Sequence, residues 1–328
     1  MKLVKYTLVS ITSILILLMS TFLYFNRGLP QAIHAAEFTC LSSEQGQFTQ
    51  DNVPFNTIYG VGLSYAHHIN ETASDFSFNE PPIFIKSKIS LLKGSGDVFI
   101  PKAAQMLTAL NDLDAEAVHI LNEEAIQIKP LLDHEAELAF VLLEDVSSED
   151  IRSAEFIPKI GFLIVNDLSD RSLAILGEGQ DNRYEYWGIS KSFPGFLPVA
   201  NSIWIPNTPH KHSNPCVTLQ TYVDGELRQS ENSRNLIYTP EDILKFVLAK
   251  YQSVSLKKGD VFLTGTPGGV IFNVPRWKVR LASLISMDRF QKLAINLKDN
   301  HVNQFLTKGN QVKVSGEWLG SVDVVIGE

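Results

Sequence analysis

Acidic residues alternate along a stretch that continues as an apolar strand. Acids occupy Asp133, Glu135 and Glu137, and residues 138–142 are all apolar, as in a buried strand. Because side chains on a strand alternate between faces, the three carboxylates are predicted to leave one face. Buried carboxylates repel one another unless a cation lies among them, and oxygen ligands favour Mg²⁺, followed by Mn²⁺ or Ca²⁺. A half-exposed strand with a solvated acidic face would show the same pattern.

A histidine and a glutamate lie three residues apart in the segment 64–71. If this segment is helical, His68 and Glu71 share one face. A carboxylate beside an imidazole raises its basicity, and such a pair is suited to taking a proton from water. The alternative interpretation is a surface contact without a catalytic role.

Charged residues follow two other predicted strands. A strand at 81–86 ends in Lys86, and an apolar strand at 161–165 is followed by Asp167 and Arg171. Asp167 could complete the carboxylate set, and Arg171 could hold a substrate carboxylate through two hydrogen bonds. Alternatively, Lys86 extends to water and Arg171 belongs to an exposed turn.

Two further segments combine small residues with a polar side chain. Lys191 lies among aromatic and glycine residues at 187–193, and Thr266 lies in the glycine-rich segment 259–270. Glycine lets the backbone approach a ligand closely, although a plain tight turn would use the same residues.

The periodicity of apolar residues predicts a mixture of strands and helices. Further strands are expected at 58–62, 97–101, 202–205, 217–223, 236–238 and 311–326, and helices at 103–121, 240–250 and 276–300. A helix capped by Ser147 and a hairpin at Asp224-Gly225 are also predicted.

The 328 residues suffice for one large domain or two small ones. A net charge of -8 without a basic cluster argues against nucleic acid as a partner.

The N-terminal region is predicted to anchor the chain in a membrane. Residues 6–25 carry no charge and are long enough to span a bilayer as a helix, with Lys2 and Lys5 before them. The positive-inside rule then predicts a cytoplasmic segment 1–5, a linker at 26–55 and an extracytoplasmic domain. A cleaved signal peptide and a cytosolic protein with an apolar first helix are the alternatives.

The two cysteines leave their pairing open. Cys40 and Cys216 are too few for a disulfide framework. They could pair in an oxidising compartment or remain free thiols.

Several motifs, in this order, resemble those of the fumarylacetoacetate hydrolase family. They run from about 58 to 326 and read VGLSYAHHINE, PPIFIK, DHEAELAFVL, GFLIVNDLSDRS, KSFPGFLPVA, DGELRQ and GDVFLTGTPGGV. The resemblance implies a mainly β fold with α elements, the mixed β-sandwich roll of that family's C-terminal domain, over residues 56–328. It also implies a homodimer.

The resemblance assigns roles to individual residues. The metal ligands would be Glu135, Glu137 and Asp167, and the pair that activates water would be His68 and Glu71. The remaining site residues would be Lys191 beside the reacting carbonyl, Lys86 and Arg171 near the substrate, and Thr266 in the loop that receives the substrate's acid group.

The implied reaction is metal-dependent hydrolysis of a C–C bond in a 2-oxo or 2,4-dioxo acid of the acylpyruvate type. The alternatives are an oxaloacetate decarboxylase, a 2-hydroxy-dienoate isomerase or hydratase on the same site, and an inactive metal-binding scaffold. Three features depart from the family's pattern: Leu63 replaces a common arginine, Ser172 replaces a common acid, and the segment 273–308 is longer than usual. These departures leave the metal ligands intact and bear on the substrate.

Overall fold

Two β-sheets form the body of the protein. The computed structural model describes residues 33–49, 53–71, 80–252, 255–273, 286–298 and 304–328, together with Met19. The larger sheet has nine described strands, in the order β2 (Gly46–Thr49), β12 (Ile203–Pro206), β9 (Ile160–Asn166), β8 (Ala136–Leu142), β16 (Val261–Leu263), β3 (Ile58–Val61) and β4 (Ile83–Lys86), with β11 (Leu197–Val199) beside β9 and β5 (Leu91–Lys93) beside β11.

The smaller sheet has five described strands and contains the final segment of the sequence. Its order is β15 (Glu226–Asn232), β14 (Thr218–Val223), β17 (Gln311–Gly316), β18 (Ser321–Gly327) and β6 (Gly96–Phe99). Two separate pairs join β1 (Thr39–Leu41) to β13 (Ser213–Pro215) and β7 (Leu132–Asp133) to β10 (Ser169–Asp170).

The central strands β8 and β9 are buried along their whole length, which explains their continuous apolar sequences. The smaller sheet packs closely on β9. A Cβ added to Gly316 of β17 would lie 2.3 Å from the side chain of Ile164 in β9. Glycine is therefore required at this contact between the sheets.

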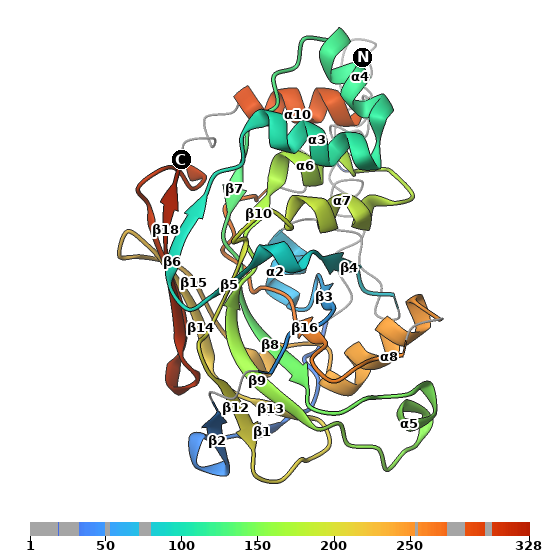
Figure 1. Ribbon diagram of the computed structural model, residues 1–328, viewed down its shortest axis with the longest axis vertical. Coiled ribbons are helices and arrows are strands. Elements are labelled where there is room, and N and C mark those ends of the chain that lie inside the picture. The colour runs from blue at the N-terminus through green and yellow to red at the C-terminus, as the bar shows by residue number, and fades with distance from the viewer. Residues whose placement is uncertain are drawn as a thin grey trace, which may run out of the picture.

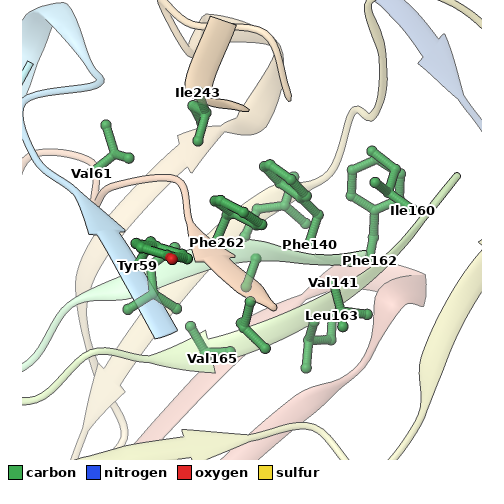
Figure 2. Close-up of a cluster of buried hydrophobic side chains, with 14 of the residues drawn as sticks. Tyr59, Val61, Phe140, Val141, Ile160, Phe162, Leu163, Val165, Ile243 and Phe262 are labelled. Carbon is green, nitrogen blue, oxygen red and sulfur yellow. The ribbon is translucent and has the colours of Figure 1, made fainter. Parts of the chain in front are cut away.

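Aromatic rings fill the core on one side of the larger sheet (Figure 2). The ring centroids of Phe140 and Phe262 are 4.8 Å apart, and those of Tyr59 and Phe262 are 5.2 Å apart. Stacked rings contribute about 0.5–1.5 kcal/mol each beyond the burial of their area. The packing fixes β8 against β16, and thereby one of the strands that carries the predicted metal ligands.

Helices gather at one end of the molecule, beyond the sheets (Figure 1). They are α3 (Ala103–Leu113), α4 (Ala115–Glu123), α6 (Arg171–Leu176), α7 (Arg183–Ser190) and α10 (Arg289–Lys298). The other helices are α2 (Ala66–Glu71), α5 (Ser148–Arg152) and α8 (Pro240–Lys250), and 3₁₀ turns occur at Ser43–Gln45, Lys88–Ser90, Ser233–Asn235 and Glu317–Leu319.

The predicted helix at 103–121 is divided in two. Asp114 has a non-helical backbone, ends α3, and accepts a hydrogen bond from the backbone N–H of Ala117 as the N-cap of α4. An aspartate favours this capping position, and the sequence periodicity alone did not reveal the break. The same carboxylate forms an ion pair of 2.8 Å with Arg289, which fastens α10 to this layer.

Other predicted elements are confirmed, with two exceptions: the strand at 236–238, and the helix at 276–300, whose described residues 286–288 are not helical. The helix at 240–250, the Ser147 cap, the Asp224-Gly225 hairpin, and the closing strands β17 and β18 are all present. The strand predicted at 236–238 is wrong, because only Leu236 forms a single bridge, to Tyr65. The segment 273–308 is described in part, and its described helix is α10.

The segment predicted as a linker at 26–55 is partly built into the fold. Within it, β1 pairs with β13 and β2 pairs with β12. Cys40 in β1 forms a disulfide with Cys216, with the two Cα atoms 5.1 Å apart. The pairing that the sequence left open is therefore present in the structure.

The predicted membrane anchoring and extracytoplasmic location need correction. A membrane span requires about 20 apolar residues in one helix. No helix among the described residues meets that requirement of length and apolarity, and this finding contradicts the predicted location. Of the predicted segments 1–5 and 6–25, all residues except Met19 lie outside the described part of the chain.

We expect reduction of the disulfide to lower the melting temperature. The two cysteines are 176 residues apart in sequence, and closing a loop of this size restricts the unfolded chain by up to about 5 kcal/mol. Calorimetry with and without dithiothreitol measures the change, with the Cys40→Ser/Cys216→Ser variant as the control that should not respond to reductant. An equal melting temperature of the oxidised and reduced wild type would contradict the expectation.

Candidate active site

The pairing of two central strands brings the predicted metal ligands together. Strand β8 carries Glu137, Glu135 directly precedes β8, and Asp167 directly follows β9. The strands are antiparallel with Ala136 opposite Asn166, and the backbone N–H of Asp167 donates to the carbonyl of Glu135 at 2.9 Å. The start of one strand therefore lies beside the end of the other, and their acids meet there.

The three carboxylates form a compact, buried group. One oxygen from each of Glu135, Glu137 and Asp167 lies within 4.8 Å of the others. Their exposed fractions are 6%, 2% and 0%. Metal–oxygen distances are about 2.0–2.6 Å for Mg²⁺ and Ca²⁺, so oxygens at this separation could bind one divalent ion.

Two lysines lie against the same acids. Lys191 donates from Nζ to Glu135 Oε2 and to Asp167 Oδ2, both at 2.7 Å. Lys86 donates to Asp167 Oδ1 and, at 2.8 Å, to the carbonyl of Phe196. Lys86 is 2% exposed, so it does not extend to water as the alternative interpretation supposed.

The acids differ sharply in their electrostatic surroundings. Burial alone would raise the pKa of Glu135, but Lys191 and Arg171 beside it lower that pKa to about 2. Burial and the neighbouring Asp167 and Glu135 raise the pKa of Glu137 well above its usual value. Among the described residues no lysine or arginine forms an ion pair with Glu137, whose Oε2 accepts only the backbone N–H of Gly265 at 2.8 Å. A divalent cation would relieve this repulsion, so the donor set fits such an ion.

The structure corrects the prediction that Asp133 joins the acidic face. Strand β7 ends at Asp133, and the chain breaks its strand geometry before β8 begins. The carboxylate instead accepts the backbone N–H groups of Ile271 and Phe272, at 2.9 and 3.0 Å, and pairs with Arg171 at 2.8 Å. Asp133 thus fastens the loop after β16 beside the acids.

Arg171 occupies the N-terminus of α6 and is engaged by acids on two sides. Its Nε lies 2.8 Å from Asp133, and its NH2 group lies 2.7 Å from Glu135 Oε1. Burial opposes the charge, but these two carboxylates raise the pKa of Arg171. The predicted contact with a substrate carboxylate stays a prediction, since these nitrogens already have partners.

A pocket beside the acids is lined by several of the other predicted site residues. His68 of α2, Lys191, Thr266 and Arg171 line it together with Glu135 and Glu137. The side chain of Glu71, three residues after His68 in α2, lies outside what the structure describes. Its role as partner of His68 therefore stays a prediction.

Gln229 is a buried residue that the sequence reasoning missed. Its Nε2 donates to Thr266 Oγ1 and to the carbonyl of Pro267, at 2.9 and 3.0 Å, and its Oε1 accepts the backbone N–H of Ala136 at 3.0 Å. It therefore connects β15, the start of β8 and the loop that lines the pocket. The signal available in the sequence was its place in the motif DGELRQ, which was given no role.

Comparisons with known proteins agree with the fold. The family model "Fumarylacetoacetate (FAA) hydrolase C-terminal" matches residues 57–326. The chain is 27% identical over 215 residues to a mitochondrial oxaloacetate decarboxylase of Dictyostelium discoideum, covering 65% of this chain and 82% of that protein. It is 29% identical to an oxaloacetate tautomerase of Bacillus subtilis, covering 66% of this chain and 60% of that protein.

Among solved structures, the chain resembles the fumarylpyruvate hydrolase of Pseudomonas aeruginosa in complex with Mn²⁺ and pyruvate. The TM-score is 0.55 at 19% identity, and the match covers 91% of this chain and 98% of that one. At this identity the likeness is one of fold.

We expect Mn²⁺ or Mg²⁺ to stabilise the protein and Glu137→Gln to remove that effect. At an ion concentration of 100 Kd, binding to the folded state adds about 2.7 kcal/mol to the free energy of unfolding. Because burial and the neighbouring acids raise the pKa of Glu137 and so favour its neutral form, the isosteric Gln should cost little stability in EDTA. Thermal melts with EDTA and with Mn²⁺ measure both effects.

Glu149→Gln, which alters an exposed acid on α5, is the matched control and should retain the full stabilisation by metal. Undiminished stabilisation of the Glu137→Gln variant would show that the ion binds elsewhere.

Affinity for the ion should rise with pH. The raised pKa favours the neutral form of Glu137, whereas the ionised form coordinates, so binding of the ion should release protons from Glu137, more of them at low pH than at high pH. Titration calorimetry in two buffers of different ionisation enthalpy counts the released protons, and the count should fall toward zero above the raised pKa. Proton uptake, or affinity that does not depend on pH, would contradict this assignment.

Proposed function

Because the chain belongs to the fumarylacetoacetate hydrolase family, we propose that it is a divalent-metal-dependent hydrolase of acylpyruvate-like 2,4-dioxo acids. One observation carries the proposal. The carboxylates of Glu135, Glu137 and Asp167 converge beside a pocket that His68 and Lys191 also line. A binding scaffold needs the acids but has no use for a base and an ammonium group in the same pocket.

In the proposed reaction, water adds to the distal carbonyl of the substrate and the bond between C3 and C4 breaks. The electron pair of that bond passes to the pyruvate portion as an enolate, which takes up a proton. The products are pyruvate and a carboxylic acid. Mg²⁺ or Mn²⁺, held by Glu135, Glu137 and Asp167, would supply a Lewis acid for two substrate oxygens.

The protein's own groups would have separate tasks. The imidazole of His68 takes a proton from the attacking water, and Glu71 is proposed to orient it. The ammonium group of Lys191, held by Glu135 and Asp167, is proposed to stabilise negative charge on the substrate oxygen as the enolate forms. Thr266 and the loop after β16 provide the wall against which the substrate's acid group is proposed to bind.

A second candidate is decarboxylation or tautomerisation of oxaloacetate on the same site. The names of the two curated relatives favour it. It requires enolate stabilisation by the ion and Lys191 but no attack by water. The need for His68 as a base therefore distinguishes the two reactions.

We expect the full chain with Mn²⁺ or Mg²⁺ to consume acetylpyruvate, followed as loss of the absorbance of its enol. His68→Ala should lower kcat by about 10²–10⁴-fold, the usual contribution of a general base, and should leave the metal-induced rise in melting temperature unchanged. His119→Ala, which removes a histidine side chain 69% exposed on α4, is the control and should retain activity.

Consumption of oxaloacetate without acetylpyruvate would favour the second candidate. Loss of the thermal response in His68→Ala would mean that His68 is a ligand or a structural residue rather than the base.

A further inference from the structure

We infer that the substrate carries a single carboxylate and that its distal acyl group is apolar. The inference rests on the proposed function and specifies its substrate class. Three observations carry it: the charge of the buried network, the composition of the pocket wall, and the backbone of Leu63.

The ion-paired network around the pocket has room for one substrate negative charge. The described side chains supply four carboxyl groups, on Asp133, Glu135, Glu137 and Asp167, and three cations. The cations are Lys86, Arg171 and Lys191. In the ion-bound protein, where Glu137 is ionised as a ligand and His68 is neutral as a general base, these side chains carry one net negative charge.

A divalent ion would change that net charge to a single positive one, which one substrate carboxylate balances. A second buried carboxylate would remain uncompensated, which is costly in an interior of low dielectric constant. Ionisation of Asp170, a buried acid that caps α6, would only add negative charge and increase this cost.

Apolar side chains supply a large part of the pocket wall. Val61, Leu63, Phe84, Ala174 and Trp187 belong to the lining. The ring of Trp187 lies near Phe84, at a centroid distance of 6.2 Å, and near the backbone of Gly62, where an added Cβ would lie 2.7 Å from the ring. Packing therefore fixes this part of the wall, and its side chains offer apolar contact.

The cations that line the described pocket are already engaged. Lys191 binds Glu135 and Asp167, and Arg171 binds Asp133 and Glu135. Arg183 is nearby but lies over the rings of Tyr184 and Trp187, at 5.0 and 5.8 Å, and is not part of the pocket lining. A distal carboxylate would therefore meet cations that already form ion pairs with acids of the protein.

Leu63 is held in the wall at an energetic cost. Its φ is 56°, in the left-handed region that is unfavourable for a residue with a side chain, and it is 3% exposed. Hydrogen bonds fix both neighbours: the N–H of Gly62 donates to the carbonyl of Pro82 at 2.9 Å, and the carbonyl of Ser64 accepts from Ile237 at 3.0 Å. Strained residues persist where the surrounding structure determines them, and here the result is an aliphatic side chain at the pocket.

The test compares two ligands of equal chain length that are not cleaved. In 2-oxopentanoate the fifth carbon is a methyl group, and in 2-oxoglutarate it is a carboxylate. Titration calorimetry on the full chain saturated with Mn²⁺ should give a Kd for 2-oxopentanoate at least tenfold lower than that for 2-oxoglutarate. Neither measurement depends on hydrolysis.

Leu63→Arg should reduce or reverse this preference by placing a cation in the wall. Leu63→Met is the matched control and should retain the preference, because Met and Arg are both unbranched at Cβ and meet the same backbone strain. A melting curve establishes that each variant is folded. If Leu63→Arg does not fold, the wild-type ratio of the two Kd values decides the question alone.

Equal binding, or tighter binding of 2-oxoglutarate by the wild type, would overturn the inference and leave the proposed metal site standing. Binding of neither acid in the presence of Mn²⁺ would overturn the proposed site and this inference together. A tenfold preference for 2-oxopentanoate without hydrolysis of acetylpyruvate would support the inference while contradicting the hydrolytic reaction.

Discussion

Burial of several acidic side chains in one place is the constraint on which the rest of the structure depends. Carboxylates removed from water require cations or hydrogen-bond donors, and here two lysines, an arginine and backbone N–H groups provide them. Glu137 receives the least compensation, and its raised pKa expresses that imbalance. The arrangement is stable enough to fold but leaves one acid for which a divalent ion is the natural partner.

This electrostatic arrangement depends on elements distant in sequence. The β8–β9 pairing sets the separation of the acids, whereas Gln229 from β15 and Asp133 from β7 hold the loop that forms the opposite wall. Both side chains are buried, so loss of either would leave several unpaired donors and acceptors. The site is therefore a property of both sheets together.

Sequence reasoning identified the parts whose signal is local. The apolar run of β8, the helix α8, the Ser147 cap of α5 and the hairpin at Asp224 were predictable because periodicity and capping residues act over a few positions. Alternation along one strand groups only the acids of that strand. The family motifs added Asp167, from another strand, as the third metal ligand beside Glu135 and Glu137. The break between β7 and β8, which turns Asp133 away, and the hydrogen bonds of Gln229 depend on contacts with distant residues. The burial of Lys86 also depends on distant residues, and a lysine at the end of a predicted strand does not reveal it in the sequence.

The parallel pairing of β18 with β6 has a consequence for how the protein is made. Strand β6 lies early in the sequence, yet its neighbour in the sheet is synthesised more than two hundred residues later. Until β17 and β18 have been synthesised, the strands of the smaller sheet that pack on one side of β9 are missing. The nascent chain must therefore keep this apolar surface from aggregating from the synthesis of β9 until that of β17 and β18, and such non-local pairing favours slow folding.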